Sequence, residues 1–201
     1  LSRVIVIDDG STDGTAEVAR AAGAEVIATP GNGGKTRALA QGLRLVTTGH
    51  VMLLDADLVG LTPADITALL DPVMQGRAAA SLSLRGNAPR TWRLIGLDYI
   101  SGERVLPMRL VAPHLDALHA LPRFGFEVFL NRLLLGAGRP VAVVPWPGVA
   151  SPSKAAKQGP WRGLRSDAAM MADIFRTISP AESLRQIAGL RRLARQRSCP
   201  P

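Results

Sequence analysis

Cysteine is nearly absent from this chain of 201 residues, since Cys199 is the only one. A single cysteine excludes a disulfide framework and a metal site built from cysteines, and it fits a reducing cytoplasm. The sequence also lacks an apolar run of about 18 residues, the length that a membrane-spanning helix needs, and it shows no signal-peptide pattern. We therefore expect a cytoplasmic protein that is soluble or that binds peripherally at the inner face of the membrane.

Lysine is scarce as well. Lys35, Lys154 and Lys157 are the only lysines among the 24 basic residues, so arginine carries almost all of the formal net charge of +8. Such an excess favours anionic partners such as nucleotides, phosphates, lipid headgroups or nucleic acid. A genomic bias toward arginine and alanine explains the same composition equally well, so the charge alone does not select a partner.

Apolar residues make up 47% of the chain, which is enough for one sizeable core. Strands are expected at residues 3–7, 24–29 and 50–57, and each is followed by a helical pattern, over residues 11–23, 31–46 and 62–74. Ser11 or Thr12 should cap the first helix and Gly23 should end it, while Thr62 should cap the third helix with Pro63 in its first position. This alternation predicts an α/β fold with a mainly parallel central sheet and helices on both faces.

The second half of the chain is less regular. Residues 78–86 and 140–150 are expected to form strands, and residues 122–138 contain a strong helix that ends between Gly136 and Gly138. Beyond Ser151 the chain is basic, with helices expected over residues 165–178 and 181–197. We expect a catalytic domain over residues 1–150 and a basic loop with a helical tail over residues 151–201.

Pairs of carboxylates follow two of the expected strands. Asp8 and Asp9 end the strand in "VIVIDDGSTDGT", and Asp55 and Asp57 end the strand in "VMLLDADL". Ligands of such sheets bind beyond the carboxyl ends of the strands, where these acids would repel one another without a cation or hydrogen-bond donors. Oxygen ligands point to Mg²⁺ or Mn²⁺. An aspartate after a strand can also merely cap the next turn, but two such clusters favour a site.

Three motifs in this order, "VIVIDDGSTDGT", "GNGGKTRALAQG" and "VMLLDADL", resemble the nucleotide-binding half of family 2 glycosyltransferases of the GT-A fold. The resemblance implies that Asp8 or Asp9 contacts the nucleoside, that Asp55 lies near the ribose, and that Asp57 binds the metal. The nucleotide-sugar site that it implies consists of Asp8, Asp9, Gly10, Ser11, Lys35, Asp55, Ala56 and Asp57.

Two rival families fit less well. A P-loop would need glycine at position 29, where the sequence has Thr29. A phosphorylation receiver domain would need a lysine on a later strand, and no lysine occurs between Lys35 and Lys154.

Residues 99–107 and 122–134 resemble the acceptor-side segments of the same superfamily, and the second is most similar to glucosyl-3-phosphoglycerate synthases and polyprenyl-phosphate sugar transferases. Glu127 would begin an apolar helix beside Phe124, Phe126 and Phe129, and would act as the catalytic base; a plain acid in the first helical turn is an equally good interpretation. A turn with Gly102, Glu103 and Arg104 would face the acceptor, and Arg104 could bind a phosphate.

Downstream, Lys154, Lys157 and Arg162 would form a loop over the leaving diphosphate. Ser151 stands where relatives carry a histidine metal ligand, so a third protein ligand is in question.

The resemblance covers most of residues 3–165 but lacks the family's first strand and its loop, so we expect that about forty residues, a βα unit, precede Leu1. The sequence thus predicts a metal-dependent transferase of sugars from UDP- or GDP-sugars to an acceptor hydroxyl or phosphate, on a phosphorylated small molecule or a polyprenyl phosphate. Nucleic acid is not an expected partner, whereas membrane contact and a homodimer are compatible with the sequence. A nucleotidyltransferase and a degenerate, non-catalytic, membrane-peripheral module stay open as alternatives.

Overall fold

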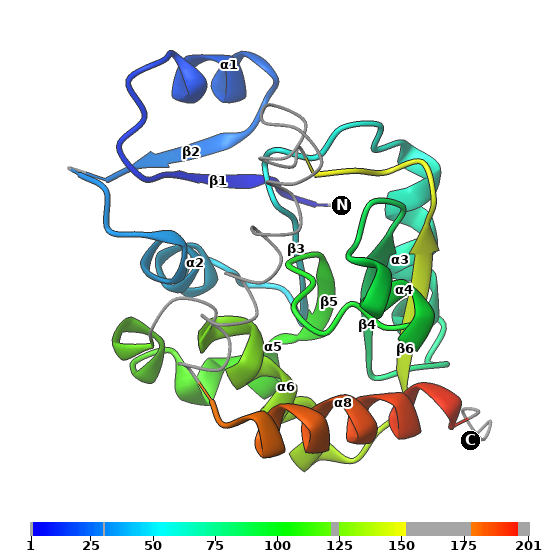
Figure 1. Ribbon diagram of the computed structural model, residues 1–201. Helices are drawn as coiled ribbons and strands as arrows, with labels where there is room; N and C mark the ends of the chain where they lie inside the picture. Colours follow the sequence, from blue (N-terminus) through cyan, green and yellow to red (C-terminus); the bar gives the residue numbers. More distant parts are fainter. Residues whose placement is uncertain (1, 30, 122–124, 152–177, 197–201) are drawn as a thin grey trace, which may run out of the picture.

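The computed structural model describes residues 2–29, 31–121, 125–151 and 178–196. Its strands form two groups (Figure 1). Strands β1 (Ile5–Asp8) and β2 (Glu25–Ala28) form a parallel pair. The second group is a four-stranded sheet in the order β3-β5-β4-β6, with bounds β3 His50–Leu53, β4 Ala80–Arg85, β5 Arg104–Pro107 and β6 Val141–Trp146.

The four-stranded sheet is mixed. β4 and β6 are parallel, whereas β5 runs antiparallel to both β3 and β4. β5 begins at Arg104, the last residue of the turn that the sequence indicated, and a strand of only four residues gives too short a pattern to detect. In the described residues no strand pairing joins β1 to β3. The expected α/β class is confirmed, although the sheet is divided into two parts.

The helices are α1 (Thr15–Ala21), α2 (Lys35–Arg44), α3 (Pro63–Met74), α4 (Arg90–Ile95), α5 (Met108–Val111), α6 (Gly125–Ala137) and α8 (Pro180–Arg195), with 3₁₀ turns η1 (Ala112–His114) and η2 (Ala117–Ala120). None of the described helices combines the length and the apolar character needed to cross a membrane. The expected helix over residues 165–178 lies outside the described residues, apart from its last residue.

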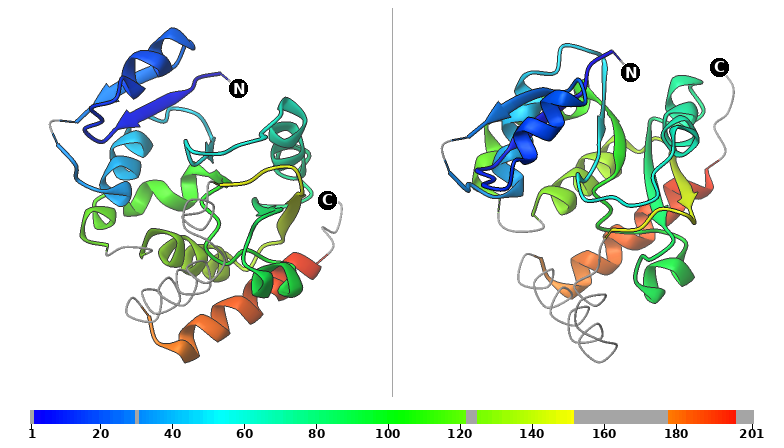
Figure 2. Two further views of the ribbon diagram at one scale, coloured as in Figure 1. Left: turned by 45° about the horizontal axis from the view of Figure 1, so that its top comes forward. Right: turned by 90° about the horizontal axis from the view of Figure 1, so that it is seen from above.

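Helices cover both faces of the four-stranded sheet. Leu69 and Val73 of α3 pack with Trp146 on one face. On the other face, Leu82 and Leu106 join a larger core to which α2, α6 and α8 contribute. Figures 1 and 2 place the β1–β2 pair and α8 at opposite ends of the molecule, with α8 lying along α6. The tail helix therefore shares the main core, while the proposed boundary at residue 150 stays a prediction.

The first helix begins later than expected. Asp13 accepts hydrogen bonds from the Thr15 backbone N–H (3.2 Å) and hydroxyl, and Gly14, with φ of 79°, is the N-cap. Ser11 instead donates its N–H to Asp8 Oδ1 (3.0 Å). The prediction of Ser11 or Thr12 as the cap was wrong, because these local bonds hold the chain in a turn before the helix.

The start of α3 is as expected, with Thr62 and Asp65 forming a reciprocal capping box and Pro63 following the cap. Thr62→Ala should therefore lower the free energy of unfolding by about 1 kcal/mol in chemical denaturation, because the Asp65 N–H loses its acceptor. Thr67→Ala on the same helix, whose hydroxyl donates only to the Pro63 carbonyl (2.9 Å), is the matched control and should cost less. Equal effects would contradict the capping role.

Candidate active site

Asp9 anchors the glycine-rich turn, residues 31–34, to the end of β1. Its carboxylate accepts the N–H groups of Gly33 (2.8 Å) and Gly34 (2.6 Å) and the Thr29 hydroxyl (3.2 Å). The bond from Gly33 makes the largest contribution to a pKa of Asp9 below its ordinary value; burial opposes it, and the bonds from Gly34 and Thr29 lower the pKa further. Asp9 is thus an ionised tether that fixes the backbone just before Lys35.

Asp8 is buried, and its Oδ1 accepts the Ser11 N–H (3.0 Å). Gly10 has φ of 86° and lies against Gly31, so the turn after β1 touches the glycine-rich turn. Gly10 and Ser11 are exposed on this edge. The two acids of the first motif therefore have distinct roles in the fold, Asp8 within its own turn and Asp9 across to the next.

Lys35 is the first residue of α2 and joins two acids from distant parts of the sequence. Its Nζ lies 2.8 Å from Asp55 Oδ1 and 3.1 Å from Glu127 Oε1. Burial lowers the pKa of Lys35, but the negative charges of Glu127 and Asp55 outweigh this and raise it above the ordinary value. Lys35 is therefore a firmly charged ammonium group held between the end of β3 and the first turn of α6.

The three groups surround a small pocket. It is lined by Lys35, Leu39, Leu53, Leu54, Asp55, Ser101, Gly102, Arg104, Phe126, Glu127 and Leu130. The Glu127 side chain is 5% exposed and that of Asp55 is 28% exposed. The pocket thus combines an apolar wall with a few charges, and its volume of about 10 Å³ is that of about one water molecule.

Gly102 sets the space beside Asp55. A Cβ atom at position 102 would lie 2.7–2.9 Å from the Asp55 carboxylate, closer than real Cβ atoms come. Any larger residue would therefore displace the acid from Lys35, so the glycine of this motif serves the geometry of Asp55.

Glu103 and Arg104 do not form the exposed acceptor turn that the sequence indicated. Both are fully buried, and Arg104 is the first residue of β5. The Arg104 guanidinium donates to the carbonyls of Ser101 (2.7 Å) and Tyr99 (3.3 Å) and to Asn131 Oδ1 (2.7 Å). The Arg104 guanidinium uses its N–H groups for hydrogen bonds inside the protein. Arg104 therefore supports the pocket from below and does not offer paired N–H groups to a phosphate. Burial lowers the pKa of Arg104, against the opposing charges of Glu127, Asp98 and Glu103.

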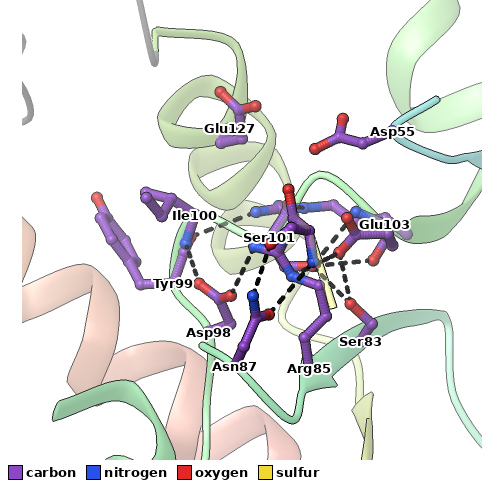
Figure 3. A network of polar contacts seen from close by, with 12 residues as sticks. Asp55, Ser83, Arg85, Asn87, Asp98, Tyr99, Ile100, Ser101, Glu103 and Glu127 are labelled. Carbon is purple, nitrogen blue, oxygen red and sulfur yellow. Dashed lines mark hydrogen bonds and ion pairs between the residues drawn. The ribbon is translucent and has the colours of Figure 1, made fainter. Parts of the chain in front are cut away.

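A buried polar network continues below the pocket (Figure 3). Glu103 Oε2 accepts the hydroxyls of Ser83 (2.7 Å) and Ser101 (2.9 Å) and lies 3.6 Å from Arg85 Nε. Arg85 also reaches Asp98 at 3.4 Å. Burial raises the pKa of Asp98 above its usual range, against the charge of Arg85. Asp55 and Glu127 lie together on one side of this network, which gives their surroundings a rigid base.

Asp57 meets the segment that follows β6. The Ser151 hydroxyl lies 3.4 and 3.3 Å from the two Asp57 carboxylate oxygens. Asn87 holds the Ser151 backbone through two bonds, donating to its carbonyl (2.6 Å) and accepting its N–H (3.3 Å). Val59 and Ala150 form an antiparallel bridge of two bonds, 2.7 and 3.0 Å. The bonds from Asn87 and the Val59–Ala150 bridge therefore hold Ser151 next to Asp57.

The structure thus brings most of the candidate residues to one edge, but in subsets. Lys35, Asp55, Glu127 and Gly102 meet directly, Asp57 meets Ser151, and Asp8 and Asp9 connect to them only through the glycine-rich turn. Ala56 is exposed between Asp55 and Asp57. Lys154, Lys157, Arg162 and Phe124 lie outside the described residues.

Asn87 and Asn131 were missed from the sequence. Asn87 follows the end of β4 at the same edge as the acids, and Asn131 stands one helical turn after Glu127, so strand-end position and four-residue spacing were the available signals.

Comparison with solved structures defines the class of fold. Glucosyl-3-phosphoglycerate synthase from Mycobacterium tuberculosis with Mn²⁺, UDP-glucose and phosphoglyceric acid is similar over 96% of this chain and 69% of that one, with a TM-score of 0.61 and 24% identity. The same synthase with Mn²⁺, UDP and phosphoglyceric acid gives a TM-score of 0.63 at 22% identity, over 97% and 68% of the two chains. The fold is therefore the GT-A fold.

The sequence assigns the family. Residues 1–120 match the model of glycosyl transferase family 2, and the chain belongs to that family. The chain is also 42% identical over 77 residues to glycosyltransferase AglJ of Haloferax volcanii, a match that covers 37% of this chain and 24% of that relative. The chain thus spans about a quarter of the length of this curated relative.

Asp9→Asn should destabilise the protein in a pH-dependent way. An amide supplies one acceptor oxygen in place of two, so we expect a loss of about 1–2 kcal/mol in the free energy of unfolding at pH 7. Because the pKa of Asp9 is lower in the folded state than the usual 3.8, the ionised tether stabilises the fold above that pH and loses its effect as the pH falls through the folded value.

The difference between wild type and Asp9→Asn, measured by urea unfolding, should therefore shrink below about pH 4. Asp71→Asn on α3 is the control, since the Asp71 carboxylate accepts no hydrogen bond from the described residues. A difference that is constant from pH 3 to 7 would contradict the role of the charge.

Proposed function

We propose that this protein transfers a sugar from a nucleoside-diphosphate donor, a UDP- or GDP-sugar, to an acceptor hydroxyl or phosphate. The observation that carries the proposal is the contact of Lys35 with both Asp55 and Glu127. Asp55, the proposed donor-side acid, and Glu127, the proposed base, both contact the same ammonium group, in a pocket with an apolar wall. Membership of glycosyl transferase family 2 supports the same reaction class.

The donor would lie along the edge formed by the ends of β1 and β3. Asp8, Gly10 and Ser11 would face the nucleoside, with Asp55 near the ribose. Lys35 would contact the diphosphate, and the 2.8 Å contact of its Nζ with Asp55 supports this role. The M. tuberculosis synthase, crystallised with UDP-glucose, supports this class of donor.

The residues around Asp57 fit Mg²⁺ or Mn²⁺. Within the described ranges, no three Asp, Glu, His or Cys side chains cluster so that they could hold a metal ion by themselves. Asp57 and the Ser151 hydroxyl nevertheless provide two hard oxygen ligands, and Mg²⁺ is commonly held by one or two carboxylates with phosphates and water completing its shell. The synthase structures with Mn²⁺ or Mg²⁺ support this choice. A bound metal would offset the negative charge that develops on the leaving diphosphate.

Glu127 would act as the base. Its carboxylate is almost fully buried beside Phe126 and held by Lys35, so its orientation is fixed before substrates bind. The acceptor oxygen would attack the anomeric carbon as the bond to the diphosphate breaks, and the acceptor proton would pass to Glu127. Lys35 would stabilise the negative charge on the donor side throughout.

The acceptor would enter beside Gly102. With Arg104 buried, a phosphate on the acceptor would have to be bound by other groups. Lys154, Lys157 and Arg162 keep the role that the sequence predicts for them, a loop over the leaving diphosphate. A phosphorylated small molecule and a polyprenyl phosphate both fit this requirement.

Asp57→Ala should weaken the binding of UDP- and GDP-sugars in the presence of Mn²⁺ by at least about tenfold, because a carboxylate ligand of the metal is lost. Isothermal titration of the intact protein measures this. Asp71→Ala, which removes a carboxylate from α3, is the matched control and should bind as the wild type does. Metal-dependent donor binding that survives in Asp57→Ala would refute the proposed metal site.

Glu127→Gln should lower kcat by about 100-fold or more while the KM for the donor changes little, because the amide keeps the shape but cannot accept a proton. Steady-state kinetics, with chromatography of the products, measures this. Release of a nucleoside diphosphate is the expected product pattern. Pyrophosphate would identify a nucleotidyltransferase instead and would overturn the proposed reaction.

A further inference from the structure

A second pocket lies at the opposite edge of the four-stranded sheet. Its lining comes from the start of β3, the segments before β4 and β6, the second residue of α5, and the ends of α3 and α8. These lining residues are His50, Val73, Gly76, Arg77, Ala78, Ala79, Arg109, Arg139, Pro140 and Gln196. The cavity measures about 480 Å³, which falls in the range of small-molecule sites.

This pocket is separate from the candidate active site. His50 begins β3, whereas Asp55 stands two residues beyond the end of that strand. At about 3.3 Å per extended residue, the two positions are roughly 17 Å apart. Nothing in the proposed sugar transfer uses the second pocket.

The charge of the pocket has one sign. Arg77, Arg109 and Arg139 line it from three different segments, and no acidic residue is among its described lining residues. In the part of the chain that the structure describes, Arg109 and Arg139 form no salt bridge, and Arg77 donates only its Nε, to Gln75 (2.9 Å). Three exposed arginines therefore line one pocket with most of their hydrogen-bond donors available.

Helix ends account for only part of this charge. α3, α6 and α8 each end next to the pocket, at Met74, Ala137 and Arg195. A helix C-terminus is equivalent to about half a negative charge, so three of them offset only about half of the charge of three guanidinium groups. If the three arginines served only to stabilise the helix ends, their positive charge would not need to exceed the negative charge of those ends. The excess points to a further role.

We infer that this pocket binds a phosphate-bearing anion, either a phosphorylated small molecule or a phosphate headgroup. Guanidinium groups match the oxygens of a phosphate in pairs, and arginines from different segments can approach one phosphate from several sides. The His50 ring can donate a further hydrogen bond, and Val73 and Ala79 offer apolar surface for the rest of the molecule.

The test compares two double variants that each remove two positive charges. Arg109→Gln with Arg139→Gln changes the pocket, while Arg90→Gln with Arg93→Gln changes two exposed arginines of α4. The full chain is titrated with pyrophosphate and with glucose 6-phosphate in EDTA, which prevents metal-mediated binding at Asp57. Thermal melts confirm that both variants fold.

We expect saturable binding to the wild type that weakens by about tenfold or more in the pocket variant, since charge-assisted contacts are lost. Binding should be unchanged in the α4 variant and in Lys35→Gln, which removes the cation of the active site. Co-sedimentation with phosphatidylcholine vesicles containing phosphatidic acid separates the two sources. If only vesicle binding is lost in the pocket variant and kept in the controls, the ligand is a lipid headgroup. If only binding of the soluble probes behaves in this way, the ligand is a free molecule.

Absence of wild-type binding to pyrophosphate, to glucose 6-phosphate and to the vesicles alike would overturn the inference, as would an equal loss in both double variants. Loss in Lys35→Gln alone would overturn it too, because the anion would then occupy the active site.

Discussion

The ammonium group of Lys35, held between the carboxylates of Asp55 and Glu127, is the contact on which the site depends. Asp55 comes from the end of β3 and Glu127 from the first turn of α6, so without a cation between them two acids would face one pocket and repel each other. Lys35 makes their approach favourable. It also joins the part of the site formed by the glycine-rich turn and Asp55 to the part that α6 provides through Glu127.

The surrounding fold fixes Lys35 and its partners from several directions. Asp9 binds the N–H groups of the two glycines that precede Lys35, so the end of β1 sets where α2 begins. Gly102 leaves the space that Asp55 occupies. Beneath them, the buried Arg104 ties β5 to α6 through Asn131. Buried hydrogen bonds of Arg104 thus support the pocket from below and help to keep the charged groups in place.

Much of this was predictable from the sequence, and the failures have identifiable causes. The strand that ends at Asp8, the strand β3 that ends shortly before Asp55, the capping box at Thr62 and the helix that begins near Glu127 follow from local patterns. Glu103 and Arg104 were expected in a turn facing the acceptor because residues 99–107 resemble the acceptor-side segment of the superfamily. Their burial depends on Ser83, Arg85 and Asn131, which are far away in the sequence and become partners only once β4, β5 and α6 pack together. Tertiary pairing of charges leaves no periodic signal.

The excess of arginine shows why composition alone could not select a partner, since arginine has different tasks in this protein. Arg85 and Arg104 are internal cations that lie among Asp98, Glu103 and Glu127, so their charge is neutralised where they stand. Arg77, Arg109 and Arg139 lie at the other edge of the sheet with no acid beside them in the described pocket lining. Because the strands separate an edge of paired acids from an edge of unpaired arginines, the net charge of +8 is not spread evenly. Among the described residues, the edge away from the proposed chemistry therefore carries a pocket whose charged lining residues are all arginines.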